Sequence, residues 1–220
     1  MATSGDRRPL ASRDSGWAQA ITRRLAATSL TPDRVSQLSM LAAALAAGAY
    51  LLAGQGDGMA RGLWLVVAIL GCQGRLLCNL FDGMLAIESG KASAEGVFWN
   101  EVPDRVSDTL ILVAVGYAVG APALGWAAAA MAMLTAYVRA FGQAFGQACG
   151  RPADFSGPMA KPQRMALLTG ATLLTLAAPL WEGRDGLLIV ALWAIALGSL
   201  ITAWRRGRRL RLALGAVPRE

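Results

Sequence analysis

Apolar and polar positions alternate in long blocks along this chain. Six apolar segments lie between residues 35 and 204, and polar residues, glycine or proline separate each from the next. The segments cover residues 35–52, 62–80, 109–119, 122–140, 165–180 and 186–204. A helix needs ~20 apolar residues to cross ~30 Å of hydrocarbon, so the pattern predicts six transmembrane helices, the shorter ones lengthened by a polar turn. We therefore expect an all-α membrane protein with one membrane domain over residues 31–204.

The chain before this domain follows a different pattern. Trp17, Ile21 and Leu25 recur at every fourth position within residues 15–30, and arginines occupy other faces of the helical wheel. This spacing predicts a short amphipathic helix that lies on the membrane surface. Residues 1–14 are polar, and we expect a disordered basic tail there.

The composition supports a membrane protein. Of the 220 residues, 55% are hydrophobic and 16% are charged, whereas a soluble domain has ~45–50% apolar and ~25% charged residues. These proportions exclude a disordered chain and a disulfide-rich secreted domain. The chain has no histidine, which excludes a Ser/His/Asp triad and every metal site that needs an imidazole ligand.

The distribution of charge predicts a topology. The net charge is +7 at pH 7, and arginines cluster before the first apolar segment and after the last one, in residues 205–220. Basic flanks mark the cytoplasmic side of a membrane protein. With six spans both termini are cytoplasmic, residues 205–220 form a basic tail, and the expected location is a bacterial-type inner membrane. Nucleic-acid binding is disfavoured, because no basic domain with interleaved aromatic residues accompanies these flanks.

Acidic residues gather in one part of the chain, although ionisable groups at membrane depth are costly and mostly functional. Six of the 14 acidic residues lie between positions 82 and 108, namely Asp82, Glu88, Glu95, Glu101, Asp104 and Asp108. Asn100, Asp104 and Asp108 follow at intervals of four residues and share a helical face. Asn79 and Asp82 are three residues apart on the preceding segment. Two facing helices with such stripes are able to hold a hard divalent cation such as Mg²⁺ or Mn²⁺.

Fixed intervals join these positions in a longer motif. The stretch reads Asn79-x2-Asp82-Gly83-x2-Ala86-x9-Gly96-x3-Asn100-x3-Asp104. It resembles the signature of the CDP-alcohol phosphatidyltransferase family, D-x2-D-G-x2-A-R-x8-G-x3-D-x3-D, and every interval matches. The chain departs from the signature at Asn79 and Asn100, which replace the first and third aspartates, and at Ile87, which replaces the arginine. In these departures it resembles a divergent bacterial branch of the family.

The resemblance implies a site for a CDP-linked lipid and for one or two Mg²⁺ or Mn²⁺ ions. The expected metal ligands are the four motif positions and two further carboxylates: Asn79, Asp82, Asn100, Asp104, Glu101 and Asp108. The nucleotide is expected beside Asp82 and three small residues, Gly83, Ala86 and Gly96. Either Asp104 or Asp108 is expected to take the proton from the acceptor alcohol.

Basic residues predict the kind of acceptor. Arg139, Lys161 and Arg164 resemble the family's basic acceptor region, and Arg75 lies one turn before Asn79. Arginine offers a two-pronged fork to phosphate and lysine a point charge, which favours a phosphorylated polyol such as glycerol phosphate or inositol phosphate. The phosphate groups of lipids are an alternative ligand for these basic residues. The resemblance then implies transfer of a phosphatidyl or related group from CDP-diacylglycerol or a similar lipid to this alcohol, release of CMP, and a homodimer.

Plainer interpretations stay open at this point. The two asparagines and Ile87 are also compatible with a degenerate homologue that binds CDP-lipid or another membrane ligand without turnover. Asn100 is suited to cap a helix, and Arg75 is suited to anchor a lipid headgroup. A small transporter is disfavoured, because the sequence shows no inverted repeat and no pair of broken helices.

Overall fold

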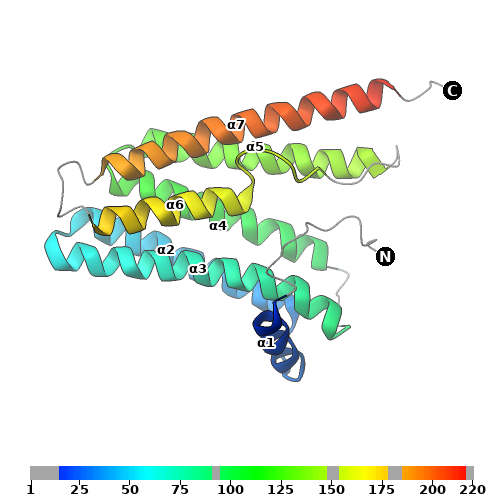
Figure 1. Ribbon diagram of the computed structural model, residues 1–220, viewed down its shortest axis with the longest axis horizontal. Coiled ribbons are helices and arrows are strands. Elements are labelled where there is room, and N and C mark those ends of the chain that lie inside the picture. The colour runs from blue at the N-terminus through cyan, green and yellow to red at the C-terminus, as the bar shows by residue number, and fades with distance from the viewer. Residues whose placement is uncertain (1–14, 91–94, 148–153, 178–184, 217–220) are drawn as a thin grey trace.

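The computed structural model describes residues 15–90, 95–147, 154–177 and 185–216, and all regular secondary structure in these ranges is helical (Figure 1). The helices are α1 (Gly16–Ala26), α2 (Pro32–Gln55), α3 (Gly58–Glu88), α4 (Gly96–Ala118), α5 (Pro122–Gln147), α6 (Lys161–Leu176) and α7 (Gly186–Gly215). Each of the helices from α2 to α7 overlaps one predicted apolar segment. The prediction of an all-α protein is therefore confirmed.

Four helices are long and apolar enough to cross a membrane, which supports a multi-pass membrane protein. They are Pro32–Gln55, Gly58–Glu88, Pro122–Phe145 and Gly186–Gly215. Helix α4 carries charged residues along its first half, and α6 has only 16 residues in the described part of the chain. Neither combines the length and the apolar composition of the other four, so the total of six transmembrane helices stays a prediction.

Both segments that flank the predicted membrane domain contain helix in their described residues. Helix α1 lies within the predicted amphipathic segment and exposes Trp17 and Ile21. The Trp17 ring also packs edge-on against Phe81 of α3, with 6.2 Å between ring centroids. A location of α1 at a membrane surface stays a prediction. Helix α7 continues to Gly215, well into the predicted basic tail, and the predicted disordered tail of residues 1–14 lies outside the described residues.

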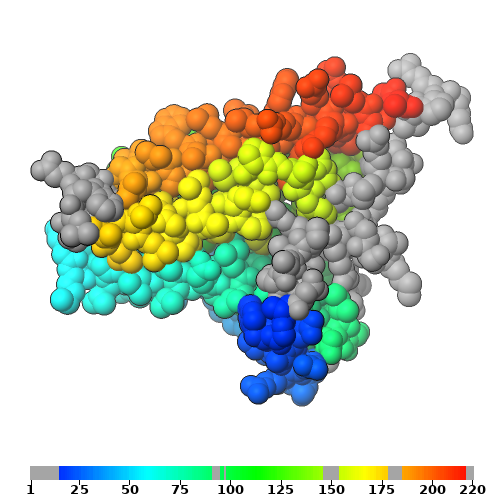
Figure 2. Space-filling view, in the orientation of Figure 1, coloured from blue at the N-terminus to red at the C-terminus, as the bar shows by residue number. Residues whose placement is uncertain are grey.

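Helices α2 to α7 pack side by side in a closed ring. Helix α3 contacts α2, α2 contacts α4, α4 contacts α5, α5 contacts α7, α7 contacts α6, and α6 returns to α3. Figure 2 shows α6 between α3 and α7 on the face in view. The ring closes around a buried apolar core that includes Tyr50, Leu112, Leu168, Leu192 and Ile195.

Small residues let neighbouring helices approach closely. A Cβ atom added at Gly71 of α3 would lie 2.9 Å from the carbonyl oxygen of Ala42 on α2. A Cβ atom added at Gly116 of α4 would lie 2.7 Å from the Cα atom of Gly125 on α5. Real Cβ atoms do not come this close to backbone atoms, so both positions require glycine. Small residues of this kind are typical of helix contacts within membranes.

Polar contacts mark the two ends of the ring. At one end Arg61 of α3 forms a salt bridge of 2.5 Å with Asp185, the residue before α7. At the other end α2 begins at Pro32, and the side chain of Thr31 caps it by accepting a hydrogen bond from the amide of Arg34. Helix α3 ends at this second end, where α4 and α6 begin (Figure 1).

Candidate functional site

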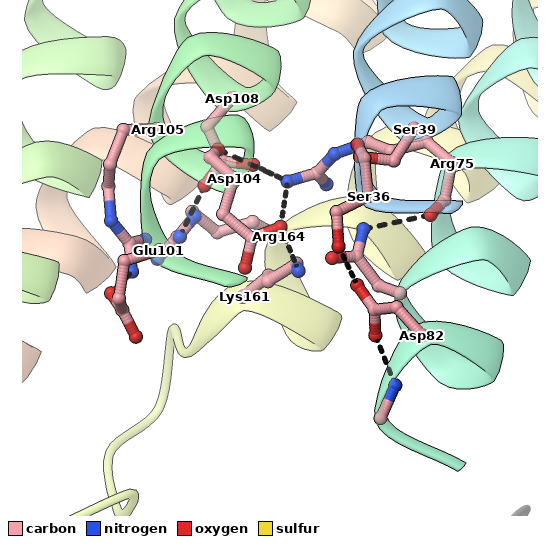
Figure 3. A network of polar contacts seen from close by, with 12 residues as sticks. Ser36, Ser39, Arg75, Asp82, Glu101, Asp104, Arg105, Asp108, Lys161 and Arg164 are labelled. Carbon is pink, nitrogen blue, oxygen red and sulfur yellow. Dashed lines mark hydrogen bonds and ion pairs between the residues drawn. The ribbon is translucent and has the colours of Figure 1, made fainter. Parts of the chain in front are cut away.

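A network of charged side chains lies where α3, α4 and α6 meet near this second end of the ring (Figure 3). Helix α3 contributes Arg75 and Asp82, α4 contributes Asp104 and Asp108, and α6 contributes Lys161 and Arg164 at its first turn. Asp82, Asp104 and Asp108 are buried, as are both arginines. Buried charges are costly unless they are paired or hydrogen-bonded. Salt bridges pair five of the six, and hydrogen bonds hold Asp82.

The carboxylate of Asp82 is held by groups from two helices. The Ser36 hydroxyl of α2 donates a hydrogen bond of 2.7 Å to Oδ2, and the amide of Gly83 donates one of 2.6 Å to Oδ1. Lys161 and Asp104 are close enough to interact with Asp82 electrostatically. The motif residues Asp82 and Asp104 therefore face a common region, as their spacing on two helices predicts.

The carboxylate of Asp104 lies between two cations. Lys161 of α6 donates a hydrogen bond from Nζ to Oδ1. Arg75 places Nη2 3.6 Å from the same oxygen and donates a hydrogen bond of 3.3 Å to the backbone carbonyl of Asp104. Asp104 was predicted as a metal ligand and as the proton acceptor, and its negative charge is already compensated by cations of the chain itself.

Asp108 lies one turn further along α4, where it pairs with two arginines. Nη2 of Arg75 is 2.7 Å from Oδ1, and Nη2 of Arg164 is 2.6 Å from Oδ2. Asp108 is 3% exposed, and the side chain of Arg75 is completely buried. Arg164 also donates from Nη1 to the carbonyl of Met159, at 3.0 Å. Arg75, Asp108 and Arg164 form a buried triad that joins α3, α4 and α6. The triad carries one net positive charge, one helical turn from Asp104.

Glu101 forms a second ionic group nearer the start of α4. Arg105 on the next turn is 2.5 Å from Oε2, and Arg139 of α5 pairs with Oε1. The guanidinium of Arg139 also lies 5.6 Å from the centre of the Phe155 ring. Burial favours the neutral acid, but the two guanidinium groups outweigh it, so the pKa of Glu101 lies below its ordinary value.

The remaining predicted site residues lie around this network. The Asn79 side chain donates a hydrogen bond of 2.8 Å to the backbone carbonyl of Arg75, one turn earlier on α3. Asn100 is exposed in the first turn of α4. The three small residues of the motif are half-buried, with Gly83 and Ala86 in the last turns of α3 and Gly96 at the start of α4.

Two features of the site were not predicted from the sequence. Ser36 was missed as the partner of Asp82, although a hydroxyl at the start of an apolar segment was a visible signal. Arg139, Lys161 and Arg164 were predicted to bind phosphate, but in this structure each pairs with a carboxylate that was predicted to bind metal. Helical periodicity identifies the face of a side chain, whereas it does not identify the partner on another helix.

Most carboxylates of the site are already paired with cations of the chain. Within the described residues no group of three or more His, Cys, Asp or Glu side chains is arranged to hold a metal ion. Glu101, Asp104 and Asp108 all pair with cations of the chain, and Asp82 is bonded only through hydrogen bonds. Mg²⁺ and Mn²⁺ prefer several oxygen ligands, with carboxylates among them. Of the four carboxylates, Asp82 is the one that forms no salt bridge among the described residues.

Comparison with solved structures identifies the fold. The chain is similar to Mycobacterium tuberculosis phosphatidylinositol phosphate synthase with CDP-DAG bound, with a TM-score of 0.70 and 21% sequence identity over 94% of this chain and 99% of that one. It is also similar to the same synthase in complex with manganese and citrate, with a TM-score of 0.69 and 22% identity over 92% and 93% of the two chains.

The apo form of that synthase gives a TM-score of 0.69 at 20% identity over 91% of this chain and 100% of that one. No protein-family model matches the chain, and no curated protein matches it. The structural neighbours are CDP-alcohol phosphatidyltransferases. At these identities the similarity establishes that this chain shares their fold.

The buried triad predicts a large stability effect at Asp108. Replacing Asp108 with asparagine keeps the side-chain shape but removes the counter-charge of Arg164 and leaves Arg75 only its 3.6 Å contact with Asp104. Breaking a buried ion pair in this way costs about 3–5 kcal/mol, so Asp108→Asn should clearly lower the midpoint of thermal unfolding in detergent.

The matched control for this variant is Asp154→Asn. Asp154 pairs with Arg209 at 3.1 Å, but both side chains are well exposed, and exposed pairs contribute about 0–1 kcal/mol. An equal shift in the two variants would show that the triad does not stabilise the fold.

Proposed function

We propose that this protein is a membrane transferase of phospholipid synthesis. It moves a phosphatidyl or related group from a CDP-linked lipid such as CDP-diacylglycerol to a phosphorylated polyol, and it releases CMP. The observation that carries the proposal is the convergence of Asp82 and Asp104, at the motif intervals, in one polar cluster of this fold. One of the structures that share the fold contains bound CDP-DAG.

The donor lipid binds, in this proposal, where α3 ends and α4 begins. Gly83 has no side chain and Ala86 has a short one, so the nucleotide can approach the backbone of α3 closely. Gly96 lets the start of α4 approach from the other side. Ser36 holds the carboxylate of Asp82 in place through its 2.7 Å hydrogen bond, which keeps this carboxylate oriented before a ligand arrives.

Asp104 is the proposed proton acceptor. A general base must reach the hydroxyl that attacks the lipid phosphorus, and Asp104 is the motif carboxylate nearer to the basic residues of the acceptor region, through Lys161. Asp108 is enclosed between Arg75 and Arg164. We therefore assign Asp108 a positioning role, in which its pair with Arg75 supports the carboxylate and backbone of Asp104.

The basic residues divide into two groups by burial. Arg139 and Lys161 have side chains that are 15% and 21% exposed, so an acceptor can reach them. Arg164 and Arg75 have side chains that are 2% and 0% exposed. We propose that Arg139 and Lys161 bind the phosphate of a polyol such as glycerol phosphate or inositol phosphate, and that Arg75 and Arg164 hold the carboxylates in place.

The proposed cofactor is Mg²⁺ or Mn²⁺, and one of the structures that share the fold contains manganese. Asp82, Asp104, Asn79 and Asn100 are the proposed ligands. When bound, the ion would neutralise charge on the diphosphate of the donor lipid. The expected homodimer, the bacterial inner membrane and the cytoplasmic termini remain part of the proposal.

A degenerate homologue that binds CDP-lipid without turnover is the second candidate. Two motif positions are amides, and Asp104 is paired with Lys161 and Arg75. An assay of CMP release from CDP-diacylglycerol separates the two candidates. Release of CMP with a phosphorylated polyol supports the transferase. Tight binding of the lipid with no release of CMP, whichever acceptor is added, supports the degenerate homologue.

The assigned roles predict the effect of isosteric changes at the two motif aspartates. Asp104→Asn removes the proposed proton acceptor and Asp82→Asn removes the proposed metal ligand, so each should lower kcat by about 10²-fold or more. The measurement is the rate of CMP release by each purified variant. The midpoint of thermal unfolding, measured alongside, should stay within a few degrees of the wild type. Glu88→Gln, an exposed change at the end of the same α3 helix, should leave the rate near that of the wild type. Full activity in either aspartate variant would remove that residue from the site.

The acceptor assignment predicts a selective defect at Arg139. Arg139→Ala should raise KM for the phosphorylated polyol about tenfold, because one charge-assisted contact to phosphate is lost. KM for CDP-diacylglycerol should stay unchanged. Steady-state kinetics with each substrate varied in turn gives both values. An equal rise in both KM values, or a defect that persists with an unphosphorylated alcohol, would contradict a phosphate contact at Arg139.

A further inference from the structure

The charges around Asp104 bear on how many metal ions the site takes. Nine ionisable side chains belong to the site: eight form the two ionic groups described above, and Asp82 lies beside them. Four are carboxylates, Asp82, Glu101, Asp104 and Asp108, and five are cations, Arg75, Arg105, Arg139, Lys161 and Arg164. The formal charge of these groups is therefore positive by one before any metal binds. A pair of divalent cations would have to enter a region that already carries excess positive charge.

The excess charge is concentrated on the α4 side of the site. Lys161 hydrogen-bonds Oδ1 of Asp104, and Arg75 lies 3.6 Å from the same atom. Arg75 cannot move away readily, because it is completely buried and bound to Asp108 at 2.7 Å. A second divalent ion on Asp104 would meet both cations at short range, and a repulsion of this kind is strong in a partly buried site.

On the α3 side Lys161 acts on Asp82 through its charge, without a salt bridge. Asp82 accepts hydrogen bonds from Ser36 and Gly83, and no salt bridge to it is found among the described residues. Asn79 contributes an amide rather than a carboxylate, and its nitrogen is used in a hydrogen bond to the Arg75 carbonyl. The amide oxygen of Asn79 takes no part in that hydrogen bond, which leaves a neutral oxygen on α3.

We propose that the site holds at most one divalent ion, on the Asp82 side, and that the fixed charges of Arg75 and Lys161 take the place of a second ion on the Asp104 side. Arg75 is a positioning residue, since it is buried beneath Asp104, and Lys161 is the cation that an incoming phosphate can reach. This inference concerns the same site as the proposed function, but the number of bound ions is measured without turnover.

The test counts Mn²⁺ ions bound per chain in detergent, by calorimetric titration and by electron paramagnetic resonance, with Mn²⁺ alone and with Mn²⁺ plus CDP. The wild-type protein should bind no more than one ion and show no spin coupling between ions. Two ions per chain with a coupled signal would overturn the inference. Absence of any bound ion supports the replacement of metal by fixed cations, while it removes Mg²⁺ and Mn²⁺ from the proposed function.

Variants at Lys161 test the same inference by removing positive charge from the site. Lys161→Gln removes one positive charge beside Asp104 and should tighten Mn²⁺ binding by about tenfold or more, whereas Lys161→Arg, which keeps the charge, should not. The triple variant Asn79→Asp, Asn100→Asp and Lys161→Gln should bind a second ion. Unchanged affinity in Lys161→Gln would overturn the inference even if the triple variant does not fold. Assay of CMP release by the wild type in parallel shows separately whether the proposed function holds.

Discussion

The buried triad of Arg75, Asp108 and Arg164 is the interaction on which the site depends. It joins three helices of the ring through buried charges that would be costly if they were unpaired. Because both oxygens of Asp108 are occupied by arginines, the first turn of α6 is held against the middle of α4. This contact brings Lys161 to Asp104, and it fixes the distance between the motif carboxylates of α3 and α4.

The same network sets the electrical character of the site. In a site for a diphosphate, positive charge has to come from metal ions or from the chain. Here the chain supplies it through Lys161 and Arg75, which contact Asp104, whereas Asp82 is held by hydrogen bonds and is influenced by Lys161 only through its charge. In the proposed function the two sides of the site have different tasks, with metal binding on α3 and fixed positive charge between α4 and α6.

Much of the fold and part of the site could be predicted from the sequence. The apolar segments predicted the helices, and the motif intervals predicted that Asp82 and Asp104 share a region. Hydropathy alone did not predict that α7 continues to Gly215, because helical structure continues past the apolar stretch where arginine, leucine and alanine favour it. Arg164, one partner of Asp108, lies 56 positions away in sequence, and Arg139, one partner of Glu101, lies 38 positions away. Such pairs depend on how the ring closes, which periodicity does not describe.

A structure of the protein with CDP-diacylglycerol would show directly whether Asp82 and Asp104 bind the diphosphate of the donor lipid. We expect density for the diphosphate between α3 and α4, next to these two residues, with the cytidine beside Gly83. We also expect that Arg75 stays bound to Asp108. Density for the nucleotide at any other place on the ring, with Asp82 and Asp104 making no contact to the ligand, would contradict the account.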